Sequence, residues 1–142
     1  MSDRWAQPAR RRPLVVLVED ESSIRAVVTR VLEGDGYQVL TAPHGRAALA
    51  LIASLTHPVD LLITDLSMPE LGGEALVAEL ASYQPVPPVL FISGESADSM
   101  STLPGAILQK PFTIPLLKRG VHDLLSPTGA GRHVAIAPQR VS

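Results

Sequence analysis

Polar residues that can take part in chemistry follow the apolar runs of this sequence, each close to the point where a run ends. They are Glu19, Asp20 and Glu21 after 14–18, Asp65 after 60–64, Ser93 after 89–92, and Lys110 after 106–108. Converging carboxylates repel one another unless a cation lies between them, and oxygen ligands without sulfur favour Mg²⁺ or Mn²⁺. An amine and a hydroxyl beside that cation can bind the oxygens of an anion. Together these residue types fit a phosphoryl group carried on an aspartate.

The elements that must position these residues alternate between strand and helix. Continuous apolar runs are typical of buried parallel strands, and the stripe from Ile24 to Leu32 has helical spacing. The predicted strands cover 14–18, 37–41, 60–64, 89–92 and 106–108, and the predicted helices begin near 22, 45, 74 and 113. This alternation predicts an α/β fold with a doubly wound, five-stranded parallel sheet and helices on both faces. The carboxyl ends of the strands then meet at one edge, where ligands bind in such folds.

The segment between Ser93 and Lys110 is short. It has 16 residues, which must supply both a fourth helix and the fifth strand, so the helix that begins near 113 is the fifth. Pro104 and Gly105 end any helix that forms there. We therefore expect a short or irregular fourth helix.

Composition excludes several classes of protein. The chain has 142 residues, of which 46% are hydrophobic and 18% charged, as in one packed domain. It has no cysteine, which excludes a disulfide framework, a thiolate metal site and a cysteine nucleophile. No apolar run approaches the roughly 20 residues that span a bilayer, and no signal peptide is recognisable. We expect a cytoplasmic protein that binds no membrane.

Charge divides the chain into three parts. Residues 1–13 form a basic N-terminal tail, and residues 126–142 form a C-terminal tail that Gly and Pro interrupt. The predicted domain, 14–125, has 6 basic and 13 acidic residues and a net charge of −7, which disfavours binding to nucleic acid. We expect no strand and no effector domain in the C-terminal tail.

Four motifs in order give the sequence a family resemblance. They are LVVLVEDE at 14–21, DLLITDLSMPELGG at 60–73, VLFISGE at 89–95 and LQKPF at 108–112. With these motifs the sequence resembles the receiver (response-regulator) domains of two-component signalling, from about Leu14 to Leu125. The resemblance implies a flavodoxin-like sheet with strand order 2-1-3-4-5. It also implies that Asp65 accepts the phosphoryl group.

The resemblance implies a metal site beside Asp65. Mg²⁺ (or Mn²⁺) would be bound by Asp20, Asp65 and the backbone carbonyl of Ser67, with Glu19 acting through water. The acidic pair is Glu-Asp here, whereas Asp-Asp is commoner in the family.

The resemblance also implies the residues that respond to the phosphoryl group. Ser93 and Lys110 would bind its oxygens, and the bond between Lys110 and Pro111 would be cis. Ile107 occupies the switch position, where such domains usually carry Tyr or Phe.

The function that follows is that of a stand-alone receiver and not of an enzyme. A histidine kinase or histidine phosphotransfer protein would donate the phosphoryl group. An unidentified output protein would bind the face formed by the fourth helix, the fifth strand and the fifth helix. One alternative is a degenerate receiver that binds partners without being phosphorylated. A weaker one is an aspartyl-phosphate phosphatase, because Ser67 stands where such enzymes carry a second acid.

Overall fold

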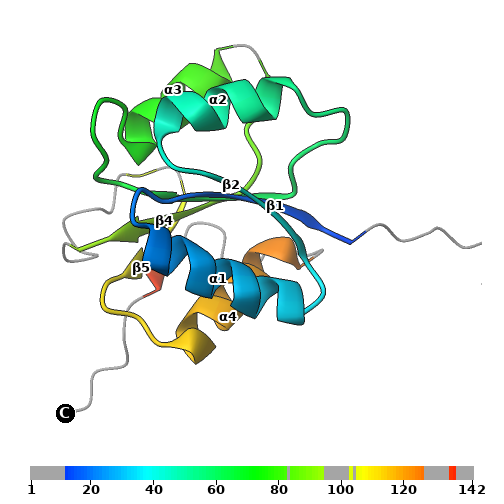
Figure 1. Ribbon diagram of the computed structural model, residues 1–142, viewed down its shortest axis with the longest axis vertical. Helices are drawn as coiled ribbons and strands as arrows, with labels where there is room; N and C mark the ends of the chain where they lie inside the picture. Colours follow the sequence, from blue (N-terminus) through cyan, green and yellow to red (C-terminus); the bar gives the residue numbers. More distant parts are fainter. Residues whose placement is uncertain (1–11, 83, 95–102, 104, 127–134, 137–142) are drawn as a thin grey trace, which may run out of the picture.

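The structure is a computed structural model that describes residues 12–82, 84–94, 103, 105–126 and 135–136. Six strands and four helices are found in this part of the chain (Figure 1). The strands are β1 (Leu14–Val18), β2 (Gln38–Ala42), β3 (Leu61–Asp65), β4 (Val89–Ser93), β5 (Ala106–Gln109) and β6 (Ala135–Ile136). The helices are α1 (Ser22–Gly34), α2 (Gly45–Ala53), α3 (Gly73–Ala81) and α4 (Ile114–Leu125).

All six strands lie in one sheet with the order β2-β1-β3-β4-β5-β6, and every neighbouring pair is parallel. The predicted order 2-1-3-4-5 is therefore confirmed. The predicted five-stranded parallel sheet is also confirmed, and the structure adds a sixth strand in the C-terminal tail, where no strand is predicted, because β6 pairs with β5 in the register Ile107 to Ala135. A strand of two residues is too short to leave an alternating pattern in the sequence.

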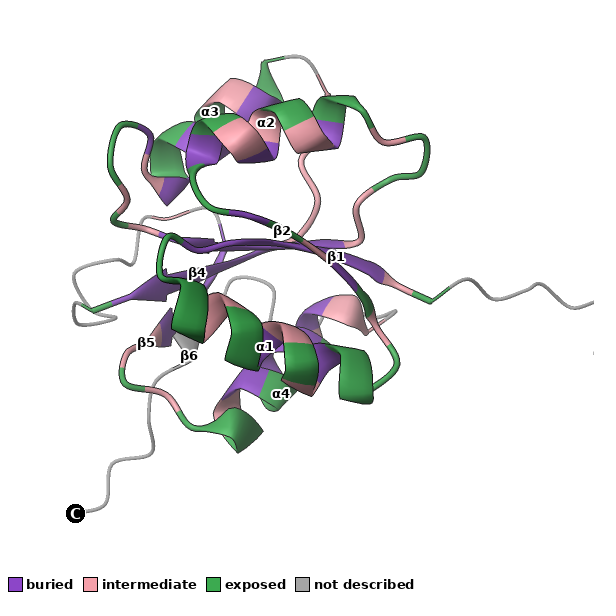
Figure 2. Cartoon of the chain, in the orientation of Figure 1, coloured by how far each residue is buried: buried purple, intermediate pink, exposed green. Residues whose placement is uncertain are grey.

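Two helices cover each face of the sheet. Figure 1 shows α1 and α4 below the sheet and α2 and α3 above it. Alternate residues of β1 serve both layers, since Val15 and Leu17 pack toward α1 and α4, and Val16 and Val18 pack toward α2 and α3. Burial on both faces explains why β1 is apolar at every position and why β3 and β4 are apolar up to the polar residues at their carboxyl ends (Figure 2).

The last described helix, α4, begins where its sequence predicts. The side-chain oxygen of Thr113 accepts a hydrogen bond from Leu116 N at 3.2 Å, and Pro115 lies in the first turn, where a missing N–H costs nothing. This helix is the fifth helix of the sequence prediction. The short fourth helix expected after Ser93 lies outside the described residues.

No helix in the described part of the chain is both long enough and apolar enough to span a membrane.

Candidate functional site

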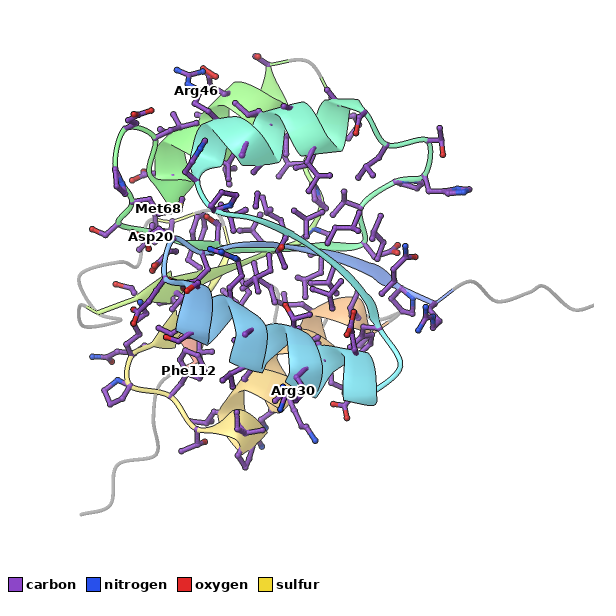
Figure 3. All side chains as sticks on the ribbon, viewed as in Figure 1. Asp20, Arg30, Arg46, Met68 and Phe112 are labelled. Atoms are coloured by element: carbon purple, nitrogen blue, oxygen red, sulfur yellow. The ribbon has the colours of Figure 1, made fainter. Side chains whose placement is uncertain are left out.

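The carboxyl ends of four strands deliver polar side chains to one pocket. Asp20 follows β1, Asp65 ends β3, Ser93 ends β4 and Lys110 follows β5. The pocket has a volume of about 700 Å³ and is lined by Asp20, Asp65, Leu66, Ser67, Gly72, Glu74, Ala75, Ser93, Gly94 and Lys110. In Figure 3, Asp20 on the β1–α1 loop and Met68 on the β3–α3 loop lie toward the same end of the sheet. The sequence prediction that these residues converge is therefore confirmed in its geometry.

Three carboxylates lie together at the pocket, of which Asp20 and Asp65 line it and Glu19 is buried beside them. Glu19, Asp20 and Asp65 each place an oxygen atom within 4.8 Å of the others. Asp20 is exposed, whereas Glu19 and Asp65 are buried. Of the described buried side-chain atoms, Glu19 Oε1 is one of two that have no hydrogen-bond partner. Converging carboxylates with a buried, unpartnered oxygen fit a hard divalent cation such as Mg²⁺.

Burial changes the acidity of Glu19. Removal of the carboxyl group from water raises its pKa from the usual 4.5 to about 7. The negative charges of Asp65 and Asp20 add to this rise. A hydrogen bond of 3.1 Å from the backbone N of Glu21 to Oε2 and the charge of Lys110 partly offset it. A cation at this site would favour the ionised form.

Asp65 lies between the acidic cluster and a lysine. Lys110 Nζ is 3.4 Å from Asp65 Oδ2, and it both donates a hydrogen bond and forms an ion pair there. Burial raises the pKa of Asp65 above its ordinary value, and the charge of Lys110 offsets part of that rise. The predicted cis bond between Lys110 and Pro111 is present. The pocket thus combines one buried carboxylate with positive charge on one side and negative charge on the other.

The backbone ties Lys110 to the neighbouring strand. Lys110 N donates a hydrogen bond of 2.7 Å to the carbonyl oxygen of Ser93, and the Ser93 side chain is buried at the edge of the pocket. Ser67 is exposed on the pocket wall. Ile107 is 3% exposed and packs in the core on the α2–α3 side of the sheet. In the described part of the chain, Ile107 is therefore not among the residues that line the pocket.

The loop from β3 to α3 passes very close to Asp65. A Cβ atom on Gly73 would lie 2.6 Å from the carbonyl oxygen of Asp65, so only glycine fits there. Gly73 N also donates a hydrogen bond of 3.1 Å to the carbonyl oxygen of Leu66. These contacts fix the end of β3 and with it the carboxylate of Asp65.

Sequence reasoning missed one residue beside the acidic pair. Arg25 on α1 donates a hydrogen bond of 2.7 Å from Nη1 to the carbonyl oxygen of Glu19. A bond from a side chain to a main-chain carbonyl leaves no signal in residue type or spacing.

Residues 15–122 match the family of response regulator receiver domains. The chain belongs to this family. The predicted family is therefore confirmed, and receiver domains of this kind are the signalling modules of two-component systems.

The relatives of this chain are proteins of different kinds and lengths. The chain is 35% identical over 116 residues to the sensor kinase CckA of Brucella abortus, a match that covers 78% of the chain and 12% of that kinase. It is 32% identical over 129 residues to a chemotaxis protein CheY homologue of Campylobacter jejuni, which covers 85% of the chain and 98% of the homologue. The chain covers 46% of the probable transcriptional regulator ycf27 of Galdieria sulphuraria, so it spans less than half the length of some relatives.

One related solved structure contains Mg²⁺ and BeF. The response regulator TrrA of Thermotoga maritima, solved in complex with Mg²⁺ and BeF, superposes with a TM-score of 0.69 at 28% identity. The match covers 80% of this chain and 99% of TrrA. The fold that holds those ligands in TrrA is thus the fold of this receiver domain.

Proposed function

We propose that this receiver domain accepts a phosphoryl group on Asp65 in a reaction that depends on Mg²⁺. The observation that carries the proposal is the position of the buried Asp65 carboxylate, with Glu19 and Asp20 on one side and Lys110 Nζ 3.4 Å away on the other. The Mg²⁺ and BeF complex of TrrA supports the same chemistry.

The acidic residues and Ser67 bind the cation in this proposal. Asp20, Asp65 and the backbone carbonyl of Ser67 would hold the cation, and Glu19 would act through water. When bound, Mg²⁺ would neutralise charge on the phosphoryl oxygens and on the carboxylates. A carboxylate oxygen of Asp65 attacks phosphorus in line while the bond between phosphorus and the donor's imidazole nitrogen breaks. The electron pair of that bond leaves with the imidazole.

Ser93 and Lys110 respond to the phosphoryl group on Asp65. The Lys110 ammonium and the Ser93 hydroxyl bind phosphoryl oxygens, so Lys110 moves from the carboxylate to the phosphoryl group. The hydrogen bond between Lys110 N and the Ser93 carbonyl couples the ends of β4 and β5. The surface of β5 and α4 would then change and bind an output protein, and the fourth helix expected to share this face lies outside the described residues. Since Ile107 is aliphatic and buried, this response uses no aromatic switch.

The donor would dock next to the pocket. Val27 and Ile114 are the large hydrophobic residues that are exposed in the described part of the chain, at 52% and 36%. Both line an apolar groove of about 620 Å³ between α1 and the start of α4, and Lys110 lines this groove as well as the phosphoryl pocket. A helix of a histidine kinase or phosphotransfer protein that packs here would bring its histidine toward Asp65. Because such a kinase draws its phosphoryl group from ATP, we expect the exchange in the cytoplasm.

The last part of the proposal is that the protein signals only through contact with another protein. The match to the Campylobacter jejuni homologue over 98% of its length supports a receiver that acts without an effector domain of its own.

The deciding experiment is phosphorylation by a small donor. Acetyl phosphate with Mg²⁺ should add one phosphoryl group to the wild type, detected by intact mass, and none after addition of EDTA. Asp65→Asn should abolish the addition. The control Asp123→Asn, on α4 outside the pocket, should leave it unchanged. Addition that survives Asp65→Asn would contradict the choice of Asp65, and no addition to the wild type would favour an unphosphorylated binding module.

A further inference from the structure

Arg25 contacts the loop that carries the acidic pair from two directions. Its side-chain Nη1 donates to the carbonyl oxygen of Glu19 at 2.7 Å, and its backbone N donates to the carbonyl oxygen of Glu21 at 3.0 Å. The Glu19 carbonyl belongs to the peptide unit that joins Glu19 to Asp20. The guanidinium therefore holds the peptide plane from which both acidic side chains extend.

We propose that Arg25 is a positioning residue for the metal site, which fixes the peptide between Glu19 and Asp20 so that both carboxylates face Asp65. This inference rests on the proposed function, because it assumes that the acidic cluster binds Mg²⁺.

The loop from Glu19 to Glu21 needs such a restraint. Few other contacts hold it, and its negatively charged side chains repel one another. Glu21 is the N-cap residue of α1, and its side chain makes no capping hydrogen bond. The main-chain N of Glu19, which belongs to the preceding peptide unit, donates a hydrogen bond to Ala42 O at 3.1 Å. With three carboxylates within 4.8 Å, the exposed Asp20 can relieve repulsion by turning toward solvent. A fixed Glu19–Asp20 peptide limits that movement before the cation arrives.

Arg25 acts through geometry more than through its charge. The recorded bond goes to a neutral carbonyl, and no ion pair between Arg25 and a carboxylate is found among the described residues. Arginine suits this task because its guanidinium is planar and always protonated, so its donors keep a fixed direction. Groups that orient metal ligands without touching the metal themselves typically contribute about 10- to 100-fold to metal affinity.

The chain offers a matched control for this idea. Arg30 lies on the same helix and lines the same surface groove as Arg25. It is exposed, and no hydrogen bond or ion pair of its side chain is recorded. Arg25→Met removes the donors while it keeps an apolar stem for packing, and Arg30→Met removes the same charge from the same helix.

The test is a Mg²⁺ titration of the folded full chain by calorimetry, together with phosphorylation by acetyl phosphate at varied Mg²⁺. We expect Arg25→Met to raise the Mg²⁺ dissociation constant roughly tenfold, while phosphorylation at saturating Mg²⁺ stays close to the wild-type rate. Arg30→Met should change the dissociation constant less than about twofold. Arg25→Lys, which restores one donor, should recover part of the lost affinity. Urea midpoints would establish that each variant is folded under the titration conditions.

The outcomes separate this inference from the proposed function. If the wild type binds Mg²⁺ and is phosphorylated while Arg25→Met matches it, the positioning role is wrong and the proposed function stands. If Arg30→Met weakens binding as much as Arg25→Met, charge and not geometry is responsible, and the inference is again overturned. A wild type that neither binds Mg²⁺ nor gains a phosphoryl group overturns both.

Discussion

At the scale of single residues, Glu19 is in the least favourable electrostatic environment of the site. Its carboxylate is fully buried and lies beside two other carboxylates. Its pKa of about 7, raised by burial, means that in the absence of a cation the folded protein holds a proton that the unfolded chain releases near 4.5. Between these values the folded state binds more protons than the unfolded state, so its stability falls as the pH rises. The raised pKa of Asp65 acts in the same direction. The acidic pocket is thus held at a cost to stability that a divalent cation would reduce.

The first prediction concerns this pH dependence. In EDTA, the free energy of unfolding of the wild type should decrease from pH 5 to pH 7.5 and then level off. Glu19→Gln cannot ionise, so its curve should decrease less over the same range. Urea unfolding at several pH values measures both curves, and Mg²⁺ should flatten the wild-type curve. Parallel curves for wild type and variant would show that Glu19 does not titrate in this range.

At the scale of elements, the β3–α3 connection decides where Asp65 points. Gly73 begins α3, and its missing side chain lets the helix start against the carbonyl of Asp65 and the side chain of Thr64. Any larger residue must push either the helix or the strand end away. The close approach therefore links the packing of α3 to the position of the Asp65 carboxylate.

Gly73→Ala tests this link. The added Cβ would lie 2.6 Å from Asp65 O and 3.1 Å from Thr64 Cγ2, so we expect a loss of about 1–3 kcal/mol in stability and slower phosphorylation. Gly34→Ala, at the end of α1 with no neighbouring atom within 4 Å, is the control and should be neutral or slightly stabilising. Urea midpoints and the phosphorylation rate measure the two effects. A Gly73→Ala protein as stable and as reactive as the wild type would show that the backbone yields at no cost.

The same scale explains which features the sequence could predict. Buried parallel strands are apolar at almost every position, so the sequence predicts β1 with its observed bounds and β3 within one residue at each end. The acidic residues and Lys110 follow such strands directly, and the topology then brings them together. Arg25 could not be predicted in the same way, because its partner is a main-chain carbonyl that any residue supplies. Ile107 was identified by its position in the motif, but only the structure reveals that it packs in the core.

On the scale of the whole molecule, the C-terminal segment adds a strand to the sheet. The sequence alone predicts that the sheet lies within residues 14–125. β6 pairs in parallel with β5 through Ile107 to Ala135 and Leu108 to Ile136, which covers the outer edge of β5. An uncovered edge strand offers unpaired N–H and C=O groups to other chains. β5 also leads directly to Lys110, which lines the pocket beside Asp65.

A chain that ends at Ser126 tests the role of this edge. Without β6, the backbone groups of β5 that point toward it lose their partners, so amide exchange should become faster at the β5 positions whose N–H groups face β6, while exchange in β1 stays unchanged. Since the other five strands remain, we expect a loss of roughly 1 kcal/mol, or a few degrees in Tm, and phosphorylation at Asp65 that persists. Removal of residues 1–11 instead is the control, and it should leave exchange in β5 unchanged. If β5 exchanges equally in the shortened and full chains, the pairing with β6 does not protect it. If the shortened chain also forms dimers at high concentration on size-exclusion chromatography, the C-terminal segment keeps this edge from pairing with a second copy.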